Sequence, residues 1–259
     1  MKKILVFENS HSLTNHLVKL WVKLAKESIN KRKYFTVAVT GGRSPLEFYS
    51  RLSEVRDFSL WSRTHIFITD EWYVSPNHKH SNFRLISESL LSYVDIPYKN
   101  IHPIKTEKTS IIFSAKQYEQ ELCSFFKLQE DGLPEFDFIL LGLGTDGHIA
   151  SLFHGESEEE VENGRGLTTI VSYPHIQYKR VTLTMPVINN AKNVVFIITG
   201  TLKAKIFEEI LVDKSNSSST TYLGSIKGNL IYMIDSVVGK NIIAQRDFND
   251  MGNYIEVIL

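Results

Sequence analysis

Four short apolar segments of this chain, rich in β-branched and aromatic residues, each end at a cluster of glycine, charged or hydroxyl residues. The segments are residues 35–39, 65–69, 136–141 and 193–199, and the clusters that follow them are residues 40–44, 70–71, 142–148 and 200–203. Short apolar segments of this composition are typical of buried strands. In an open sheet of parallel strands, ligands bind beyond the carboxyl ends. The four clusters are therefore expected to meet in one crevice.

Segments with helical spacing separate these strands. The apolar positions of residues 12–30 recur every three or four residues, and further helices are expected at 44–53, 81–93, 111–126 and 202–211. Additional strands are expected at 4–7, 181–185 and 229–235, whereas residues 153–179 read as irregular. This alternation predicts the α/β class: a Rossmann-like, doubly wound, mainly parallel sheet with helices on both faces.

The helix expected after residue 43 has a regular amino-terminal signature. Ser44 is the expected N-cap, Pro45 stands at the first helical position, and Glu47 is placed to complete a capping box.

Length and charge narrow the class of protein. A chain of 259 residues suits a single domain over residues 1–259. Its 29 basic and 29 acidic residues balance, which argues against nucleic acid as a partner. The single cysteine, Cys123, fits a reducing compartment, and no segment is long and apolar enough for a membrane span or a signal peptide. We expect a cytoplasmic protein.

Residues 142–147 match the dinucleotide pattern Gly-x-Gly-x-x-Gly, but their context does not. No regular helix and no suitably spaced acid follow, and Asp146 would repel a pyrophosphate. Nicotinamide and flavin binding are therefore not expected. The alternative is that the glycines, including Gly144, let the backbone approach a ligand while His148 acts as a general base oriented by Asp146. A purely structural histidine is the competing interpretation.

The segment 40–44 favours an anion site. Gly41, Gly42 and Ser44 precede a helix amino terminus, where free N–H groups and the helix dipole attract anions. A capped tight turn alone would explain the same residues. Lys203 lies in the first turn of another helix, where the positive end of the helix dipole disfavours a cation. An anionic ligand would explain a lysine at this position. Neither Gly-x-Ser-x-Gly nor a zinc-binding pattern occurs, so no metal is expected.

Four blocks of the sequence together resemble the 6-phosphogluconolactonase family. The likeness extends over about residues 10–235, and the blocks are TGGRSP, TDEWYVSPNHKHSNFRLISESLL, LGLGTDGHIASLFHG and YKRVTLTMPVINNAKNVVFIITGTLKA. The resemblance implies a Rossmann-like fold, no organic cofactor, and hydrolysis of 6-phospho-D-glucono-1,5-lactone to 6-phospho-D-gluconate in the oxidative pentose phosphate pathway. The ligand it implies is a sugar phosphate lactone. We expect the chain to be a monomer or a homodimer.

The same resemblance implies roles for individual residues. His148 would be the base toward water, with Asp146 as its neighbour. The residues expected to bind the phosphate or the rest of the substrate are Gly41, Gly42, Arg43, Ser44, Asp70, Arg84, Gly144, Arg180 and Lys203.

Two places depart from the family pattern. Tyr222-Leu223 stands where the family more often has a proline, which affects a loop more than the chemistry, and the other place is in the acidic segment. The acidic segment usually reads Asp-Glu-Arg, and here Trp72 stands in the third place, so that Arg43 or Arg84 is expected to replace the missing arginine. Two alternatives stay open. A glucosamine-6-phosphate deaminase would continue toward Asn-Glu-Pro after the histidine, where this chain has Ser151-Leu152-Phe153. A non-catalytic sugar-phosphate sensor would fit Trp72 but would have no need of Asp146 and His148.

Overall fold

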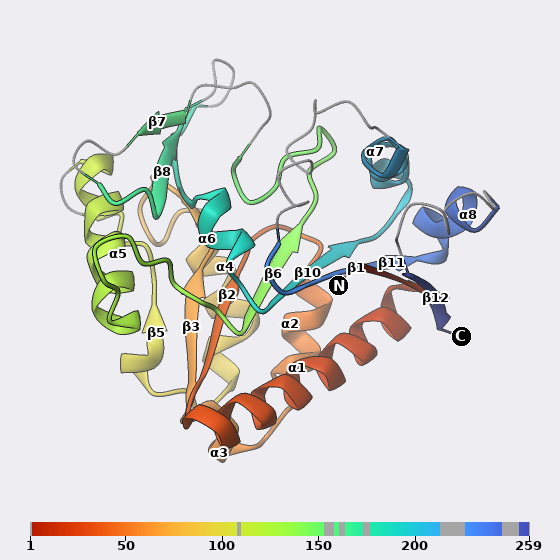
Figure 1. The fold of residues 1–259 in the computed structure, drawn as a ribbon, viewed down its shortest axis with the longest axis horizontal. Coiled ribbons are helices and arrows are strands. Elements are labelled where there is room, and N and C mark those ends of the chain that lie inside the picture. The colour runs from red at the N-terminus through yellow and green to blue at the C-terminus, as the bar shows by residue number, and fades with distance from the viewer. Residues whose placement is uncertain are drawn as a thin grey trace.

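The computed structural model describes residues 2–107, 110–152, 158–160, 164–172, 177–212, 226–244 and 254–258. These residues form an eight-stranded sheet, a smaller four-stranded sheet and the helices around them (Figure 1). Among them, no helix combines the length and the hydrophobicity that crossing a bilayer requires.

The large sheet is parallel throughout. Its strands follow the order β12-β1-β11-β10-β6-β2-β3-β5. Their bounds are β1 Lys2–Phe7, β2 Phe35–Val39, β3 Thr64–Ile68, β5 Ile101–His102, β6 Phe138–Gly142, β10 Asn193–Ile198, β11 Asn229–Asp235 and β12 Tyr254–Ile258. Every residue of β2 and β10 is buried, as expected of strands covered on both faces. The predicted class and the parallel pairing of β2 with β3 are confirmed.

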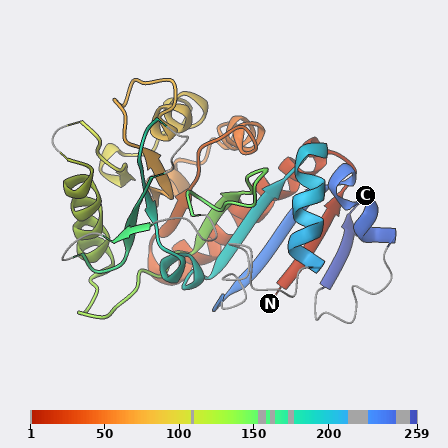
Figure 2. The ribbon, with the colours of Figure 1, turned by 90° about the horizontal axis from the view of Figure 1, so that it is seen from above.

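Helices cover both faces of this sheet, because alternate side chains of each strand point to opposite sides. On one face Leu5 and Phe7 belong to a core with α1 (Ser10–Arg32), α2 (Leu46–Leu52), α3 (Phe58–Trp61) and α4 (Asn82–Ser89). On the other, Ile4 and Val6 share a core with α5 (Ile111–Phe126), α6 (Met185–Asn189), α7 (Thr201–Val212) and α8 (Ser236–Ala244). Figure 2 shows α5 at one end of the molecule and α7 and α8 at the other.

The small sheet is antiparallel, in the order β4-β9-β8-β7. Its strands are β4 Asp70–Trp72, β7 Glu158–Glu160, β8 Thr168–Val171 and β9 Arg180–Leu183. The prediction that residues 153–179 are irregular is wrong, because β8 lies within them. β8 has only four residues and all of them are buried, so it shows no alternation long enough to recognise in the sequence. The strand predicted at 181–185 exists, but it pairs in this second sheet.

The start of α2 differs from the prediction. Pro45 is the N-cap and no side chain caps the helix, so the capping box with Ser44 and Glu47 is wrong. The Ser44 hydroxyl instead accepts a hydrogen bond from Lys203 Nζ at 2.6 Å. The helix expected at 81–93 ends at Ser89 and is followed by a 3₁₀ turn at Leu91–Tyr93. A second 3₁₀ turn, Tyr98–Asn100, precedes β5.

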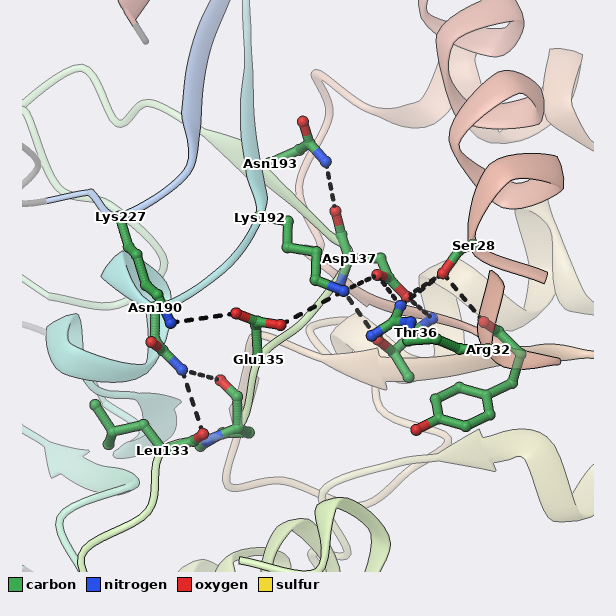
Figure 3. A network of polar contacts seen from close by, with 12 residues as sticks. Ser28, Arg32, Thr36, Leu133, Glu135, Asp137, Asn190, Lys192, Asn193 and Lys227 are labelled. Carbon is green, nitrogen blue, oxygen red and sulfur yellow. Dashed lines mark hydrogen bonds and ion pairs between the residues drawn. The ribbon is translucent and has the colours of Figure 1, made fainter. Parts of the chain in front are cut away.

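A polar network ties the amino ends of the central strands together (Figure 3). Asp137, just before β6, accepts hydrogen bonds from Ser28 Oγ at 2.8 Å and from the Thr36 backbone N–H at 3.0 Å. Arg32 and Lys192 both form ion pairs with the same carboxylate, the latter at 3.0 Å. We call these five residues the Asp137 network.

Candidate active site

The strand order creates a crevice between β2 and β6. From β2 the chain winds outward through β3 to β5, whereas β6 leads to β10 and β11 on the other side. Such a switch point is where open α/β sheets bind ligands. A cavity of about 300 Å³ lies there. Among the residues predicted from the sequence, those that line it are Gly41, Gly42, Arg43, Ser44, Asp70, Gly144, His148, Arg180 and Lys203.

The loop after β2 packs tightly against α4. A side chain at position 41 would collide with the amide group of Asn82, so the site requires Gly41. Gly42 has a φ of +86°, in the region that glycine adopts without strain. The Asn82 side chain donates to the backbone oxygen of Asp70 at 2.7 Å. Asn82 thus packs against the 40–44 loop and is hydrogen-bonded to the segment that follows β3.

The two acids after β3 have different surroundings. Asp70 is buried and accepts hydrogen bonds from Thr69 Oγ1 and Ser151 Oγ at 2.8 and 2.7 Å. Glu71 accepts from the backbone N–H groups of Asn82 and Phe83, both at 2.7 Å, at the start of α4. Burial raises the pKa of Glu71 to about 7, although these donors favour the charged form. Glu71 therefore holds the start of α4 in place, while Asp70 lines the cavity.

Asp146 and His148 form a close pair at the end of β6. His148 Nδ1 lies 2.6 Å from Asp146 Oδ1. A side chain at position 144 would collide with both groups, so Gly144 makes room for the pair. The next turn needs φ values of +86° at Gly147 and +53° at Ala150. Asp146 does not line the cavity itself and reaches it through His148.

The pair has the electrostatics of a base and its orienting carboxylate. Partial burial opposes ionisation of Asp146, but the hydrogen bond and charge of His148 outweigh it and lower the pKa of Asp146. A charged carboxylate only accepts hydrogen bonds, so in the neutral imidazole the proton sits on Nδ1 and the basic lone pair is on Nε2. This arrangement is suited to taking a proton from water.

Two cations of the cavity wall, Arg43 and Lys203, lie close together. Lys203 reaches from α7 to Ser44, and burial together with the charge of Arg43 lowers the pKa of Lys203. Neither Arg43 nor Lys203 forms an ion pair with any described acid. Two neighbouring cations that are not paired with an acid provide a site for an anion. In the part of the chain that is described, no three His, Cys, Asp or Glu side chains gather in a way that could hold a metal ion.

The chain matches the sequence profile of the family Glucosamine-6-phosphate isomerases/6-phosphogluconolactonase over residues 8–224. It belongs to this family. A 6-phosphogluconolactonase from Synechocystis sp. is 36% identical over 217 residues, which cover 83% of this chain and 88% of that protein. A probable 6-phosphogluconolactonase 2 from Oryza sativa subsp. indica is 30% identical, over 95% of this chain and 91% of the relative.

Solved structures agree with this membership. The 6-phosphogluconolactonase from Trypanosoma brucei superposes with a TM-score of 0.82 at 28% identity, covering 93% of this chain and 99% of that one. The enzyme from Trypanosoma cruzi gives a TM-score of 0.82 at 27% identity, covering 93% and 97%.

The two arginines expected to replace the family arginine at position 72 lie in different places. Arg43 lines the cavity. Arg84 does not: its Nε is 2.7 Å from Glu88 Oε1, and its Nη1 donates to the backbone oxygen of Asn77. The structure therefore brings Arg84 to an ion pair on the surface of α4. Trp72 also lines the cavity, and its ring contacts the guanidinium of Arg180.

Sequence reasoning missed two residues that shape the site. Asn82 fixes the 40–44 loop, and Ser151 joins Asp70 to Arg180 through hydrogen bonds of 2.7 and 3.4 Å. Both belong to quoted family blocks, which was the available signal. The two partners of Ser151 are 29 and 81 residues away in the sequence, and the contact of Asn82 with Gly41 depends on tertiary packing.

Proposed function

We propose that this protein hydrolyses 6-phospho-D-glucono-1,5-lactone to 6-phospho-D-gluconate, as in the oxidative pentose phosphate pathway. The observation that carries the proposal is the Asp146–His148 pair, 2.6 Å apart, facing a cavity that also holds Arg43 and Lys203. A base and an anion site in one crevice match a phosphorylated substrate that reacts with water.

His148 acts as the general base in this proposal. Asp146 accepts a hydrogen bond from Nδ1–H and fixes the ring, and Nε2 takes a proton from water as the water oxygen attacks the C1 carbonyl. The bond between C1 and the ring oxygen then breaks, and the departing oxygen receives the proton from the imidazolium. The C1 acid loses its own proton at neutral pH. A positioned base of this kind contributes ~10²–10⁴-fold to the rate.

The cations on the cavity wall bind the phosphate in this proposal. The Gly41-Gly42 backbone and Ser44 lie beside the amino terminus of α2, and Lys203 reaches across to Ser44. Arg43 and Arg180 add two guanidinium groups, which bind phosphate oxygens in a bidentate manner. Neutral gluconolactone lacks the group that these cations recognise.

Parallel assays of two reactions test the proposal. The purified protein should accelerate hydrolysis of the phosphorylated lactone well above the spontaneous rate, which is measured without enzyme and subtracted. It should not release ammonia from glucosamine 6-phosphate. Deamination without lactone hydrolysis would assign the chain to the other activity of its family. Binding of 6-phosphogluconate with no acceleration would make it a sugar-phosphate sensor.

We also propose that the protein acts in the cytoplasm as a monomer or homodimer and without nucleic acid. Its single cysteine and balanced charge support this. Cell fractionation tests the location, and analytical ultracentrifugation of the purified chain tests the oligomeric state.

A further inference from the structure

Trp72 and Arg180 form a stack in the cavity wall. They are directly opposite each other in the antiparallel pair of β4 and β9, so their side chains lie on the same face. The Arg180 guanidinium carbon lies 3.6 Å from the centre of the indole ring. We propose that Trp72 is a positioning residue whose ring fixes the Arg180 guanidinium for binding the phosphate of the substrate. This inference rests on the proposed function.

The surroundings of Arg180 favour a strong stack. Arg180 is only 7% exposed, and a cation–π contact gains strength when the cation is removed from water and the ring is an indole. A guanidinium that stacks on a ring keeps its N–H donors in its own plane. The donors therefore stay at its edge, where they match the geometry of an oxyanion.

A second contact fixes the guanidinium within that plane. Arg180 Nη1 donates to Ser151 Oγ at 3.4 Å, and the same hydroxyl donates to Asp70 Oδ2 at 2.7 Å. Thr69 and Asn82 also donate to Asp70, so this carboxylate is held on several sides. The ring of Trp72 and the Ser151 hydroxyl thus define both the tilt and the direction of Arg180.

The charge of the wall explains why an indole suits this position. Trp72 offers a π face and no charge, so it holds one cation without competing for the ligand. An arginine at position 72 would place a second guanidinium against Arg180 and displace it by repulsion. The stack therefore predicts that Trp72→Arg weakens phosphate binding.

The first test compares variants of position 72. Trp72→Leu should raise KM for the phosphorylated lactone by about 3- to 30-fold and change kcat by less than about threefold. Trp72→Phe keeps an aromatic face and should restore most of the affinity, while Trp72→Arg should raise KM. Tyr73→Leu is the matched control, because Tyr73 is the next aromatic residue and does not line the cavity. Unchanged KM in Trp72→Leu, or lowered KM in Trp72→Arg, would overturn the inference.

A double-mutant cycle shows whether Trp72 acts through Arg180. Arg180→Ala alone should raise KM by roughly 10- to 150-fold. Adding Trp72→Leu to it should then change KM by less than about twofold, since the group that Trp72 positions is gone. Fully additive effects would mean that Trp72 acts by another route and would refute the stack's role.

Product binding separates this inference from the proposed reaction. The Kd for 6-phosphogluconate, measured by calorimetry on the same variants, should follow the KM pattern. Hydrolysis by the wild-type protein tests the proposed function alone. Tight product binding that is weakened by Trp72→Leu would support the stack even if hydrolysis were absent, and product binding indifferent to Trp72→Leu would refute it.

Discussion

The two ends of the central strands carry the same kinds of charged side chain in opposite arrangements. At the amino ends, Arg32 and Lys192 both form ion pairs with Asp137, whose side chain is 6% exposed (Figure 3). At the carboxyl ends, Asp70 is satisfied by hydroxyl and amide donors, while Arg43 and Lys203 form no ion pair with a described acid. At the amino ends the cations are neutralised by a carboxylate. At the carboxyl ends Arg43 and Lys203 face a cavity instead.

This difference separates stability from function. Charged side chains that pair with one another inside the protein hold strands together, and they are not available to bind a ligand. Cations held near one another without acids cost some stability, which a bound anion can recover. Substitutions at the two ends should therefore have effects of different kinds, and each prediction below tests that separation.

Asp137→Ala should have the largest effect on stability. It removes both ion pairs and leaves the buried Thr36 N–H without its acceptor, and these losses together cost about 3 kcal/mol of unfolding free energy. Denaturant titration measures the loss, and KM and kcat of the folded variant should stay within about twofold of wild type. Lost activity with unchanged stability would contradict the separation.

Gly144→Ala should impair catalysis through geometry. The added methyl group collides with His148 and Asp146, and a displacement of about 1 Å can cost ~10²-fold in rate. We expect that loss in kcat, measured with the phosphorylated lactone. Gly142→Ala is the matched control, because Gly142 also lines the cavity but a methyl group there meets no protein atom within 4 Å, and its kcat should fall much less. Equal kcat values for the two variants would contradict a catalytic role of the Asp146–His148 pair.

Lys203→Ala should weaken substrate binding without destabilising the fold. Hydrogen bonds to a charged partner contribute ~1.5–3 kcal/mol each, so KM should rise roughly 10- to 150-fold. Burial and Arg43 lower the pKa of Lys203, so its charge is unfavourable in the folded protein and Tm should stay equal or rise.

Two comparisons control the Lys203 experiment. Lys205→Ala removes an exposed lysine from the same helix, one that pairs with Glu209 at 3.6 Å, and should leave KM unchanged. Unphosphorylated gluconolactone should respond less to Lys203→Ala than the phosphorylated lactone. Equal responses would show that Lys203 does not contact the phosphate.

His65→Phe should have the smallest effect, visible only as a change with pH. Burial, His102 and Lys99 lower the pKa of His65 from 6.5 to about 4. The folded state thus binds fewer protons between these values, and His65 destabilises the fold progressively as pH falls from 6.5 to 4. The raised pKa of Glu71 acts in the opposite direction.

The measurement for His65 is therefore a difference. The free energy of unfolding of wild type minus that of His65→Phe should decrease as pH falls through this range. A difference that does not vary with pH would refute the lowered pKa. Because His65 is not among the residues that line the cavity, kcat should show no matching change.

Local sequence patterns predicted most of the fold. Apolar segments that stop at glycine-rich or acidic clusters identified β2, β3, β6 and β10, and periodicity located α5 at its observed bounds, Ile111–Phe126. These signals are carried by neighbouring residues, and the parallel arrangement follows from strand and helix alternation. These patterns and the family resemblance together named eleven site residues, and nine of them line the cavity.

What the sequence could not predict depends on contacts between distant residues. Ser44 looked like a helix cap, but its hydroxyl bonds to Lys203 on another helix. The partner of Trp72 is Arg180, which the antiparallel register of the small sheet brings opposite it. The position of Arg84 had a local signal, since Glu88 stands four residues later and such pairs meet on a helix surface.

The most direct test of the central claim is kcat of His148→Ala with 6-phosphoglucono-1,5-lactone, corrected for spontaneous hydrolysis. We expect a loss of ~10²–10⁴-fold with little change in KM or Tm, and a smaller loss for Asp146→Asn if Asp146 only orients the ring. Activity of His148→Ala within twofold of wild type would contradict the account, because the carboxyl-end cavity would then not contain the base.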